Sequence, residues 1–273
     1  GLKALEYRGY DSAGIAVVRN QQMQVCKERG KVAALQASVN KSSFQGHCGI
    51  GHTRWATHGK PSVRNAHPHV SHDEIAVVHN GIIENNDELK LSLKNDGYIF
   101  NSQTDTETIA HLIHRFMAND VLFPEACLRA IEMLQGSYAV AITSTNESGK
   151  IIAARKGSPL VIGAGRNEYY VASDIPAIMA EVNQYYFLEE GDIAEITANS
   201  CSIYDLSGKD VDRPLHDVKQ DERVVTKAHY AHYMLKEIHE QDDVVRRCLA
   251  DVIREHNFTQ CIFPSELADL LKR

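Results

Sequence analysis

SYAVAITSTNESGKIIAARKGSPLVIGAGRNEYYVASD, residues 137–174, is the stretch that decides the fold class. It holds four short apolar runs rich in Val, Ile and Ala, and Gly, Asn or Pro lies between them, which is typical of strands joined by turns. Similar runs occur elsewhere in the chain: SAGIAVV (12–18), CGIGHTRWA (48–56), EIAVVHN (74–80) and FLEEGDIAEIT (187–197). The sequence therefore predicts a domain rich in strands.

Helical patterns lie between the groups of strands. In TDTETIAHLIHRFM (104–117) the apolar residues recur at helical spacing, and Thr104 and Glu107 form a capping-box pattern at the start. Further helices are predicted over FPEACLRAIEML (123–134) and IPAIMAEV (175–182). Grouped strands with helices between them indicate an α+β fold with mostly antiparallel sheet, because a parallel sheet needs a regular βαβ alternation.

Composition excludes several classes of protein. The chain has 273 residues, 43% of them hydrophobic and 24% charged, with a net charge of −7, so no broad basic surface for nucleic acid is expected. No apolar run approaches the roughly 18 residues of a membrane span. The six cysteines are dispersed without a C-x-x-C pair, which argues against structural zinc and favours reduced thiols in the cytoplasm.

The character of the chain changes after Leu206. SGKDVDRPLHDVKQDERVV (207–225) is polar, and the pattern from Lys227 to Arg273 is helical and charged. We therefore predict a main domain over residues 1–206, followed by a linker and helices over 207–273 that lead to a further part of the protein.

Two clusters contain candidate ligand-binding residues. YRGYDSAG (7–14) places Arg8 and Asp11 beside two glycines, which by itself favours a turn into a strand. GHTRWATHG (51–59) ends a strand in Arg54 and the only Trp of the chain, which suits the rim of a ligand site. There Arg54 would hold a carboxylate through two charge-assisted hydrogen bonds. The alternative is a surface arginine beside a packed tryptophan.

Two more clusters allow two interpretations each. In EIAVVHNGIIEN (74–85), Asn80-Gly81 between apolar runs favours a hairpin turn; the alternative is an oxyanion hole made by the Asn80 amide and the Gly81 N–H. In SQTDTETIAH (102–111), Asp105 falls in the first turn of the predicted helix. It either complements the helix dipole or receives the ammonium group of a ligand.

Histidines are concentrated in NAHPHVSH (65–72), which holds three of the fourteen in the chain. A histidine-based metallohydrolase is therefore an alternative hypothesis. However, His67 and His69 flank a proline, and no acidic residue lies at a known ligand spacing. The sequence predicts neither a metal site nor a cofactor.

Five motifs together resemble the class II glutamine amidotransferases. YRGYDSAG, HTRWATHG, NAHPH, HNGIIEN and TDTE occur here in the order of that family. Three further stretches are similar to its glucosamine-6-phosphate synthase branch: RKGSPLVIG (155–163), FLEEGDIAEIT and HYMLKEIHEQ (232–241). The resemblance implies an N-terminal-nucleophile hydrolase fold, a four-layer αββα sandwich with two antiparallel sheets between helical layers.

The resemblance also implies residue roles. Arg54 would bind the α-carboxylate of glutamine and Asp105 its α-amino group. Asn80 and Gly81 would form the oxyanion hole, and Arg8 would help to position the start of the mature chain. Each role is carried over from a motif of the family that this sequence matches.

The same family places a mobile loop and a nucleophile beside the substrate. The loop corresponds to residues 54–59, so Trp55, Thr57 and His58 would line the bound glutamine. The family's nucleophile is a cysteine at the mature N-terminus, whose α-amino group acts as general base. The printed chain starts at Gly1, inside the family's first helix. We therefore expect that residues 1–273 lack the first strand and the nucleophile, and that they are inactive alone.

The leading hypothesis is an enzyme whose glutaminase half hydrolyses L-glutamine to glutamate and ammonia. The ammonia would convert fructose 6-phosphate to glucosamine 6-phosphate in hexosamine biosynthesis, on an isomerase domain outside residues 1–273. The resemblance further implies a cytoplasmic homodimer without a cofactor, a nucleic-acid partner or a membrane anchor. The alternative function is a glutamine-binding module without catalysis.

Overall fold

The computed structural model describes most of the chain, namely residues 1–42, 44–56, 59–218 and 230–255. The chain divides into two compact units, Gly1–Gln220 and Asp221–Arg273, which are described separately. The division after residue 206 that we expect from composition stays a prediction.

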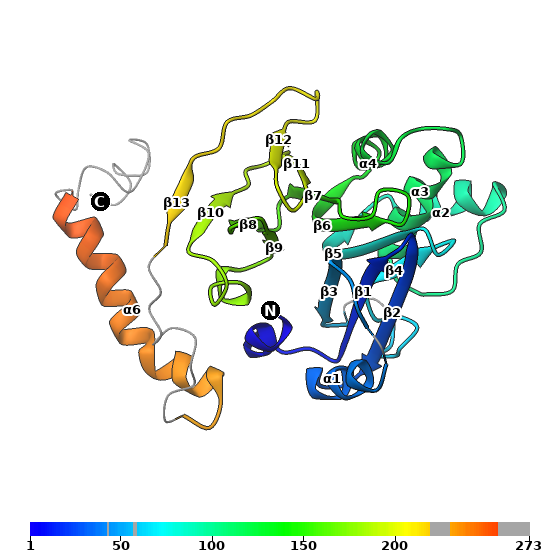
Figure 1. Ribbon diagram of the computed structural model, residues 1–273. Coiled ribbons are helices and arrows are strands. Elements are labelled where there is room, and N and C mark those ends of the chain that lie inside the picture. Colours follow the sequence, from blue (N-terminus) through cyan, green and yellow to red (C-terminus); the bar gives the residue numbers. More distant parts are fainter. Residues whose placement is uncertain (43, 57–58, 219–229, 256–273) are drawn as a thin grey trace, which may run out of the picture. The chain divides into compact units, whose positions relative to one another are not determined.

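A six-stranded antiparallel sheet forms the centre of the first unit (Figure 1). Its strand order is β12-β11-β7-β6-β5-β4, with these bounds: β4 His69–Ser71, β5 Ile75–Ile83, β6 Gly136–Ser144, β7 Ile151–Lys156, β11 Ile193–Ile196 and β12 Cys201–Tyr204. β5 and β6 pair along their whole length, from Ile75 opposite Ser144 to Ile83 opposite Gly136. This pair is therefore the most extensive ladder of the sheet.

Three helices cover one face of this sheet (Figure 1): α2 (Asn86–Asn95), α3 (Thr106–Met117) and α4 (Phe123–Glu132). The apolar stripe of α3 is fully buried against β5, with Ile109, Leu112 and Ile113 all at 0% exposure. Burying such a side chain stabilises the fold by about 1.5–3 kcal/mol. The helices predicted over 104–117 and 123–134 are thus confirmed.

The other face of the six-stranded sheet carries two smaller antiparallel sheets. One has the order β2-β1-β3 and the other β13-β10-β8-β9. Their bounds are β1 Ser12–Arg19, β2 Gln22–Arg29, β3 Cys48–Arg54, β8 Val161–Ala164, β9 Tyr169–Ala172, β10 Gln184–Phe187 and β13 Leu215–Asp217. Within the described chain β3 pairs only with β1, and β9 pairs only with β8.

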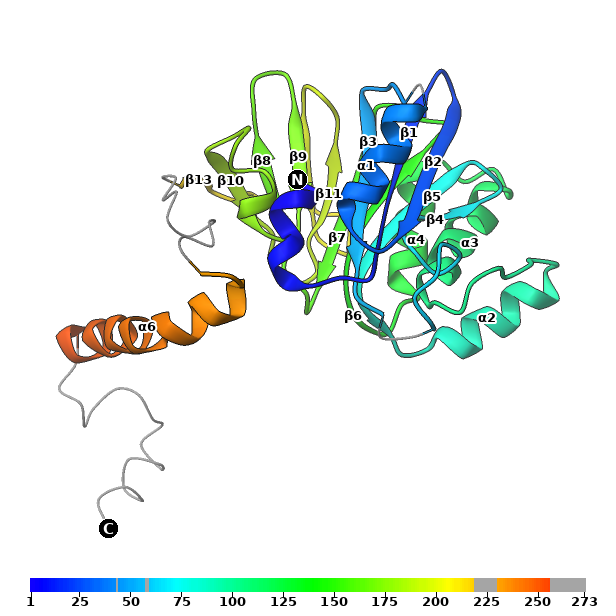
Figure 2. The ribbon, with the colours of Figure 1, turned by 90° about the horizontal axis from the view of Figure 1, so that it is seen from below.

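Helix α1 (Val32–Lys41) completes the outer layer (Figure 2). It buries Val32 and Leu35 against Ala13 of β1. The predicted α+β sandwich, with sheets between helical layers, is therefore confirmed. The second β layer differs from the expectation in one respect, because it consists of two sheets rather than one.

Two 3-10 helices meet beside the smaller sheets. η1 (Leu2–Arg8) lies between them (Figure 2) and meets η2 (Ile175–Ala177). The hydroxyl of Tyr7 donates to Asp174, and the Arg8 guanidinium donates to Ser173 Oγ and Asp174 Oδ2, both at 2.9 Å. These bonds hold the beginning of the described chain against the loop that follows β9.

The helix predicted over residues 175–182 is wrong, since only η2 forms there. Ile178 and Val182 are buried in an apolar cluster with Tyr185, and the backbone turns repeatedly between them. Packing of these two side chains under β8 and β10 therefore overrides a helical spacing that spans only two turns.

The capping box predicted at Thr104 and Glu107 is also wrong. The Glu107 carboxylate accepts hydrogen bonds from the backbone N–H groups of Asn101 and Ser102 at 2.8 and 2.7 Å, while the Thr104 hydroxyl bonds to His69 at 2.9 Å. Burial acts to raise the pKa of Glu107. Hydrogen bonds from His111, Ser102 and the Asn101 backbone outweigh burial and lower this pKa to about 2. Glu107 thus orders the loop before α3 rather than the helix terminus.

The second unit is described only for residues 230–255, which contain α6 (Tyr233–Glu255). A helix in this part of the chain agrees with the sequence pattern; residues 219–229 and 256–273 lie outside the described residues. Met234, Ile238 and Val245 of α6 are exposed. Among the described residues, no helix has the length and apolarity that crossing a membrane would require.

Candidate active site

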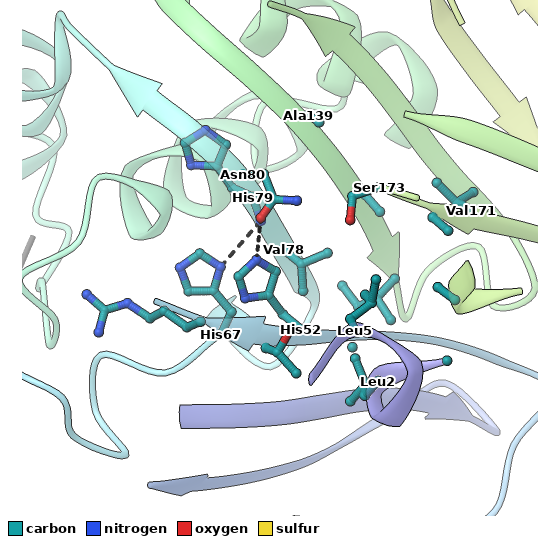
Figure 3. A pocket seen from close by; sticks show the side chains of 18 of the residues that line it. Leu2, Leu5, His52, His67, Val78, His79, Asn80, Ala139, Val171 and Ser173 are labelled. Atoms are coloured by element: carbon teal, nitrogen blue, oxygen red, sulfur yellow. Dashed lines mark hydrogen bonds between the residues drawn. The ribbon is translucent and has the colours of Figure 1, made fainter. Parts of the chain in front are cut away.

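A cavity of about 650 Å³ lies in the first unit, between the two smaller sheets and above β5 and β6 (Figure 3). Part of its wall is apolar and includes Leu2, Leu5, Val78, Ala139 and Val171. Six residues singled out in the sequence also line it: Arg8, Arg54, Trp55, Asn80, Gly81 and Asp105. The two other candidates, Thr57 and His58, lie outside the described residues.

The hairpin turn predicted at Asn80-Gly81 is wrong. Both residues lie inside β5, with Asn80 opposite Ala139 and Gly81 opposite Tyr138 on β6. Gly81 has a φ of 133°, and a Cβ there would lie 2.0 Å from the Ser137 carbonyl oxygen. Glycine is therefore required at position 81 because the backbones of β5 and β6 approach closely there. Asn80 lies within the strand, at the cavity wall and not at a turn.

Arg54 and Trp55 have the opposite exposure to that expected for a surface arginine beside a packed tryptophan. Arg54 at the end of β3 is only 4% exposed, whereas Trp55 is 66% exposed. Asp11 supports this strand end: its carboxylate accepts the Ala56 N–H at 2.5 Å and lies 3.9 Å from the Arg54 guanidinium. Burial lowers the pKa of Arg54, while the carboxylates of Asp11 and Asp105 act to raise it. Arg54 is thus a buried cation at a cavity with two acids nearby.

Asp105 links α3 to β5. It occupies the N-cap position of α3 but accepts no capping hydrogen bond from a backbone N–H of that helix, only one from the Thr106 hydroxyl at 3.4 Å. Instead its Oδ2 accepts the backbone N–H of Ile83 at 2.8 Å, and its Oδ1 lies 3.9 Å from Nδ1 of His79. This carboxylate therefore stands next to the β5 segment that contains Asn80 and Gly81.

Trp55 packs against the start of the chain. A Cβ on Gly9 would lie 2.3 Å from Cζ3 of the Trp55 ring, and Gly9 has a φ of 76°. Gly9, the first glycine of YRGYDSAG, is therefore needed both for its backbone conformation and for the close approach of the indole. The predicted turn into a strand at this motif is confirmed, since η1 ends at Arg8 and β1 begins at Ser12.

Four histidines cluster at the cavity: His52, His67 and His79 line its wall, and His69 packs against His67. His52 and His67 stack with ring centroids 4.4 Å apart, and His67 meets His69 edge to face at 4.9 Å. Burial lowers the pKa of His52 to about 4 and that of His69 to about 3, and it also lowers the pKa of His67 and His79. These imidazoles are therefore uncharged at neutral pH. In the described part of the chain, no three His, Cys, Asp or Glu side chains are placed to hold a metal ion.

The cysteines of the described chain do not contribute to this cavity. None of Cys26, Cys48, Cys127 and Cys201 lines it, and burial raises the pKa of each thiol. A raised pKa keeps sulfur in the protonated, weakly nucleophilic form. These four cysteines of the first unit therefore lack both the position and the activation that a nucleophile needs.

Two residues of the site received no role from the sequence. Asp11 holds the strand end at Arg54, and His52 bonds to the Asn80 side chain. Both belong to the motifs that we singled out, YRGYDSAG and GHTRWATHG. Their roles depend on which strands face each other, and a linear spacing carries no signal of that kind.

Comparison with known proteins agrees with this geometry. Residues 52–180 match the family model of the glutamine amidotransferase domain. That range contains Arg54, Asn80, Gly81 and Asp105. This match and the fold together show that the chain belongs to the class II glutamine amidotransferase family.

Individual relatives indicate a narrower group of proteins than the family model does. The chain is 46% identical to glutamine–fructose-6-phosphate aminotransferase (isomerizing) of Pseudomonas aeruginosa, over all of this chain and 45% of the relative. It is 44% identical to the protein of the same name from Shewanella oneidensis, with the same coverage. The solved glutamine phosphoribosylpyrophosphate amidotransferase of B. subtilis superposes with a TM-score of 0.65 at 28% identity, over 75% of this chain and 45% of that one. The chain spans about 45% of the length of the curated relatives it matches.

Proposed function

We propose that the cavity binds L-glutamine and that this domain hydrolyses its side-chain amide to glutamate and ammonia. The observation that carries the proposal is the convergence of Arg54, Asp105 and Asn80-Gly81 on one cavity from β3, α3 and β5. A free amino acid with an amide side chain needs one cation, one anion and one group of oxyanion donors. These residues supply all three.

Arg54 and Asp105 would hold the two ends of the amino-acid backbone. Arg54 is buried, so a bidentate bond to the α-carboxylate would form in a medium that screens charge weakly. Asp105 is already held by Ile83, which fixes the direction from which it would receive the α-ammonium group. Both ligand charges would thus meet groups that are ordered before binding.

Asn80 and Gly81 would stabilise the tetrahedral intermediate. They are consecutive residues of one strand and both line the cavity, so their donors would approach the same oxygen. Removing one donor from an oxyanion hole typically costs about 2.7–4 kcal/mol of transition-state stabilisation. Trp55, Thr57 and His58 would close over the ligand, and Arg8 would hold the beginning of the mature chain near it.

The nucleophile in this proposal is the N-terminal cysteine of the family, with its own α-amino group as the base. It is not one of the six cysteines in the printed sequence, each of which has chain on both sides and no free α-amine. For the whole protein we propose, from the name its relatives carry, transfer of the amide nitrogen of glutamine to fructose 6-phosphate. Formation of glucosamine 6-phosphate by a cytoplasmic homodimer is our further proposal, from the resemblance of the motifs. That activity would need a domain outside residues 1–273.

A second function is favoured by one observation. None of the described cysteines of the first unit lines the cavity, which favours a glutamine-binding module without catalysis as the alternative function. Such a module would bind glutamine in the same orientation without releasing glutamate.

The test measures binding and turnover separately. Titration calorimetry with residues 1–273 should show glutamine binding, with no glutamate release above the uncatalysed background. The whole protein with the cysteine start of the family should release glutamate, and an electrophilic glutamine analogue should label that cysteine. Absence of glutamine binding in both proteins would refute the assignment of the site. Equal turnover by both would place the nucleophile inside residues 1–273.

A further inference from the structure

The side chain of Asn80 meets the ring of His52 across the boundary between two sheets. His52 lies on β3 and Asn80 on β5, and Nε2 of the imidazole is 2.8 Å from Oδ1 of the amide (Figure 3). Both residues line the cavity. The figure shows the amide oxygen of Asn80 directed toward His52 and its nitrogen directed away, toward the side of Ser173.

The direction of this amide decides what Asn80 presents to a substrate. Its NH₂ group donates hydrogen bonds and would stabilise a developing oxyanion, whereas its carbonyl oxygen would repel one. The two directions differ by a rotation of the terminal torsion, which is intrinsically broad. The partner of the amide must therefore fix the direction that is useful.

The tautomer of His52 provides this choice. A neutral imidazole has one N–H group, and Nε2 donates to Oδ1 of Asn80 only if it carries the hydrogen. Burial lowers the pKa of His52 to about 4, and a backbone hydrogen bond to His79 acts weakly in the opposite direction, as a carbonyl acceptor facing an N–H group would. Since a carbonyl cannot donate, these contacts agree that the ring presents a donor to β5.

The other ring nitrogen supports the same tautomer. Nδ1 of His52 is buried and has no hydrogen-bond partner in the described part of the chain. A buried N–H without an acceptor is rarer and costlier than an unused lone pair. The hydrogen is therefore more stable on Nε2, where the Asn80 carbonyl accepts it, and stacking on His67 holds the ring in place.

We propose that His52 is a positioning residue: its Nε2–H group holds the Asn80 carbonyl and so turns the amide NH₂ into the cavity. This role rests on the proposed hydrolysis of glutamine, because only that reaction develops the negative charge that Asn80 would meet. His52 itself touches no reacting atom. It acts through Asn80.

Kinetics of the whole protein test the role. His52→Ala should lower kcat about 30-fold and change KM less than threefold, because the donor serves the intermediate and not the ground state. The double variant with Asn80→Ala should be no more than twofold slower than Asn80→Ala alone. His52→Gln, whose amide NH₂ can donate to the same oxygen, should recover at least tenfold of the loss.

A matched control measures the cost of losing a buried imidazole. His111 is also buried, bonds to Ser71 and does not line the cavity. His111→Gln should keep kcat within threefold of the unmodified protein. A fall equal to that of His52→Ala, or fully multiplicative losses in the double variant, would overturn the positioning role.

A second measurement does not depend on turnover. Nitrogen-15 NMR of the unmodified protein should show His52 as the Nε2–H tautomer at pH 7. The Nδ1–H tautomer would overturn the inference even if glutamine is hydrolysed. A protein with the Nε2–H tautomer but no glutamine binding would instead refute the proposed function and leave the His52–Asn80 bond established.

Discussion

β5 contributes to two regions with opposite chemistry. Near its beginning, Ile75 and Val77 pack into the core under α3, where the buried side chains are almost all aliphatic. Near its end, Asn80 and Gly81 face the cavity, whose wall holds Arg54 and the histidine cluster. The strand and its pairing with β6 are continuous through both regions.

The difference concerns what each region requires of its side chains. Apolar burial is not directional, so the core under α3 asks for volume and shape. A buried polar side chain is costly unless a partner meets it, so every contact in the cavity wall is specific. Changes in the core should therefore affect stability, and changes in the cavity wall should affect chemistry.

Acidification should have the largest effect on stability, and it should act through the buried histidines of the cavity wall. The folded pKa values of His52 and His69, about 4 and about 3, lie below the usual 6.5. Below pH 6.5 the unfolded chain therefore binds protons that the folded chain does not bind. The free energy of unfolding has its full value above pH 6.5 and falls as the pH decreases. These two groups alone lower the free energy of unfolding by about 2.7 kcal/mol per pH unit near pH 5, and the lowered pKa values of His67 and His79 act in the same direction.

Urea denaturation at pH 7.5, 6 and 5 measures this slope. His52→Gln should reduce it by about 1.4 kcal/mol per pH unit, because one of the four buried rings that stay unprotonated in the folded state is gone. His47→Gln, at an exposed imidazole, should leave the slope as it is. A free energy of unfolding that is constant from pH 7.5 to 5 would contradict burial of these rings in the neutral form.

Ile109→Ala should give the next largest effect, in the apolar region. Ile109 is 0% exposed on α3, so the cavity left behind should cost about 2–5 kcal/mol of folding free energy. The kcat per folded molecule should stay within twofold. Chemical denaturation and active-site titration give the two values, and Leu91→Ala on α2, 63% exposed, is the control that should cost under about 0.5 kcal/mol.

Asn80→Ala should show the reverse pattern. In the whole protein, kcat should fall about a hundredfold or more while glutamine still binds, because the amide acts mainly on the tetrahedral intermediate. Asn95→Ala, at an exposed asparagine that ends α2, is the matched control. Loss of folded protein with an unchanged kcat per folded molecule would assign Asn80 to structure instead.

Arg54→Ala should have the smallest of these effects. We expect the KM for glutamine to rise at least tenfold, because the α-carboxylate would lose its fixed cation. Arg54→Lys should recover only part of the loss, since a lysine keeps the charge but not the two parallel donors. Arg129→Ala, at an exposed arginine of α4, serves as control. An unchanged KM would remove Arg54 from the substrate site.

Local patterns predicted the elements well where one face of an element is apolar over several turns or residues. The helix that became α3 and the strands β5 to β9 follow from such runs. The same approach failed over residues 175–182, where packing of Ile178 and Val182 replaced a helix by turns. It also failed at Thr104 and Glu107, since the Glu107 carboxylate bonds to the loop before the helix.

Asn80-Gly81 shows the limit most clearly. The dipeptide is a strong hairpin signal, and the glycine does have a positive φ. However, the pairing of β6 with both ends of β5 keeps the strand straight through it. The short-range signal therefore marks a position that requires glycine, but the change of direction that it predicts does not occur.

The amino-acid sequence alone determined that the domain is α+β with mostly antiparallel sheet and which motifs are candidates for the site, because periodicity and residue type are local properties. The sandwich arrangement was implied by the family resemblance. Only the tertiary structure decided that Arg54 is buried while Trp55 is exposed, and that Asp105 reaches Ile83. It also decided that His52 meets Asn80 across two sheets. These contacts join residues distant in the chain, and such contacts depend on how the sheets stack, which no spacing within one segment encodes.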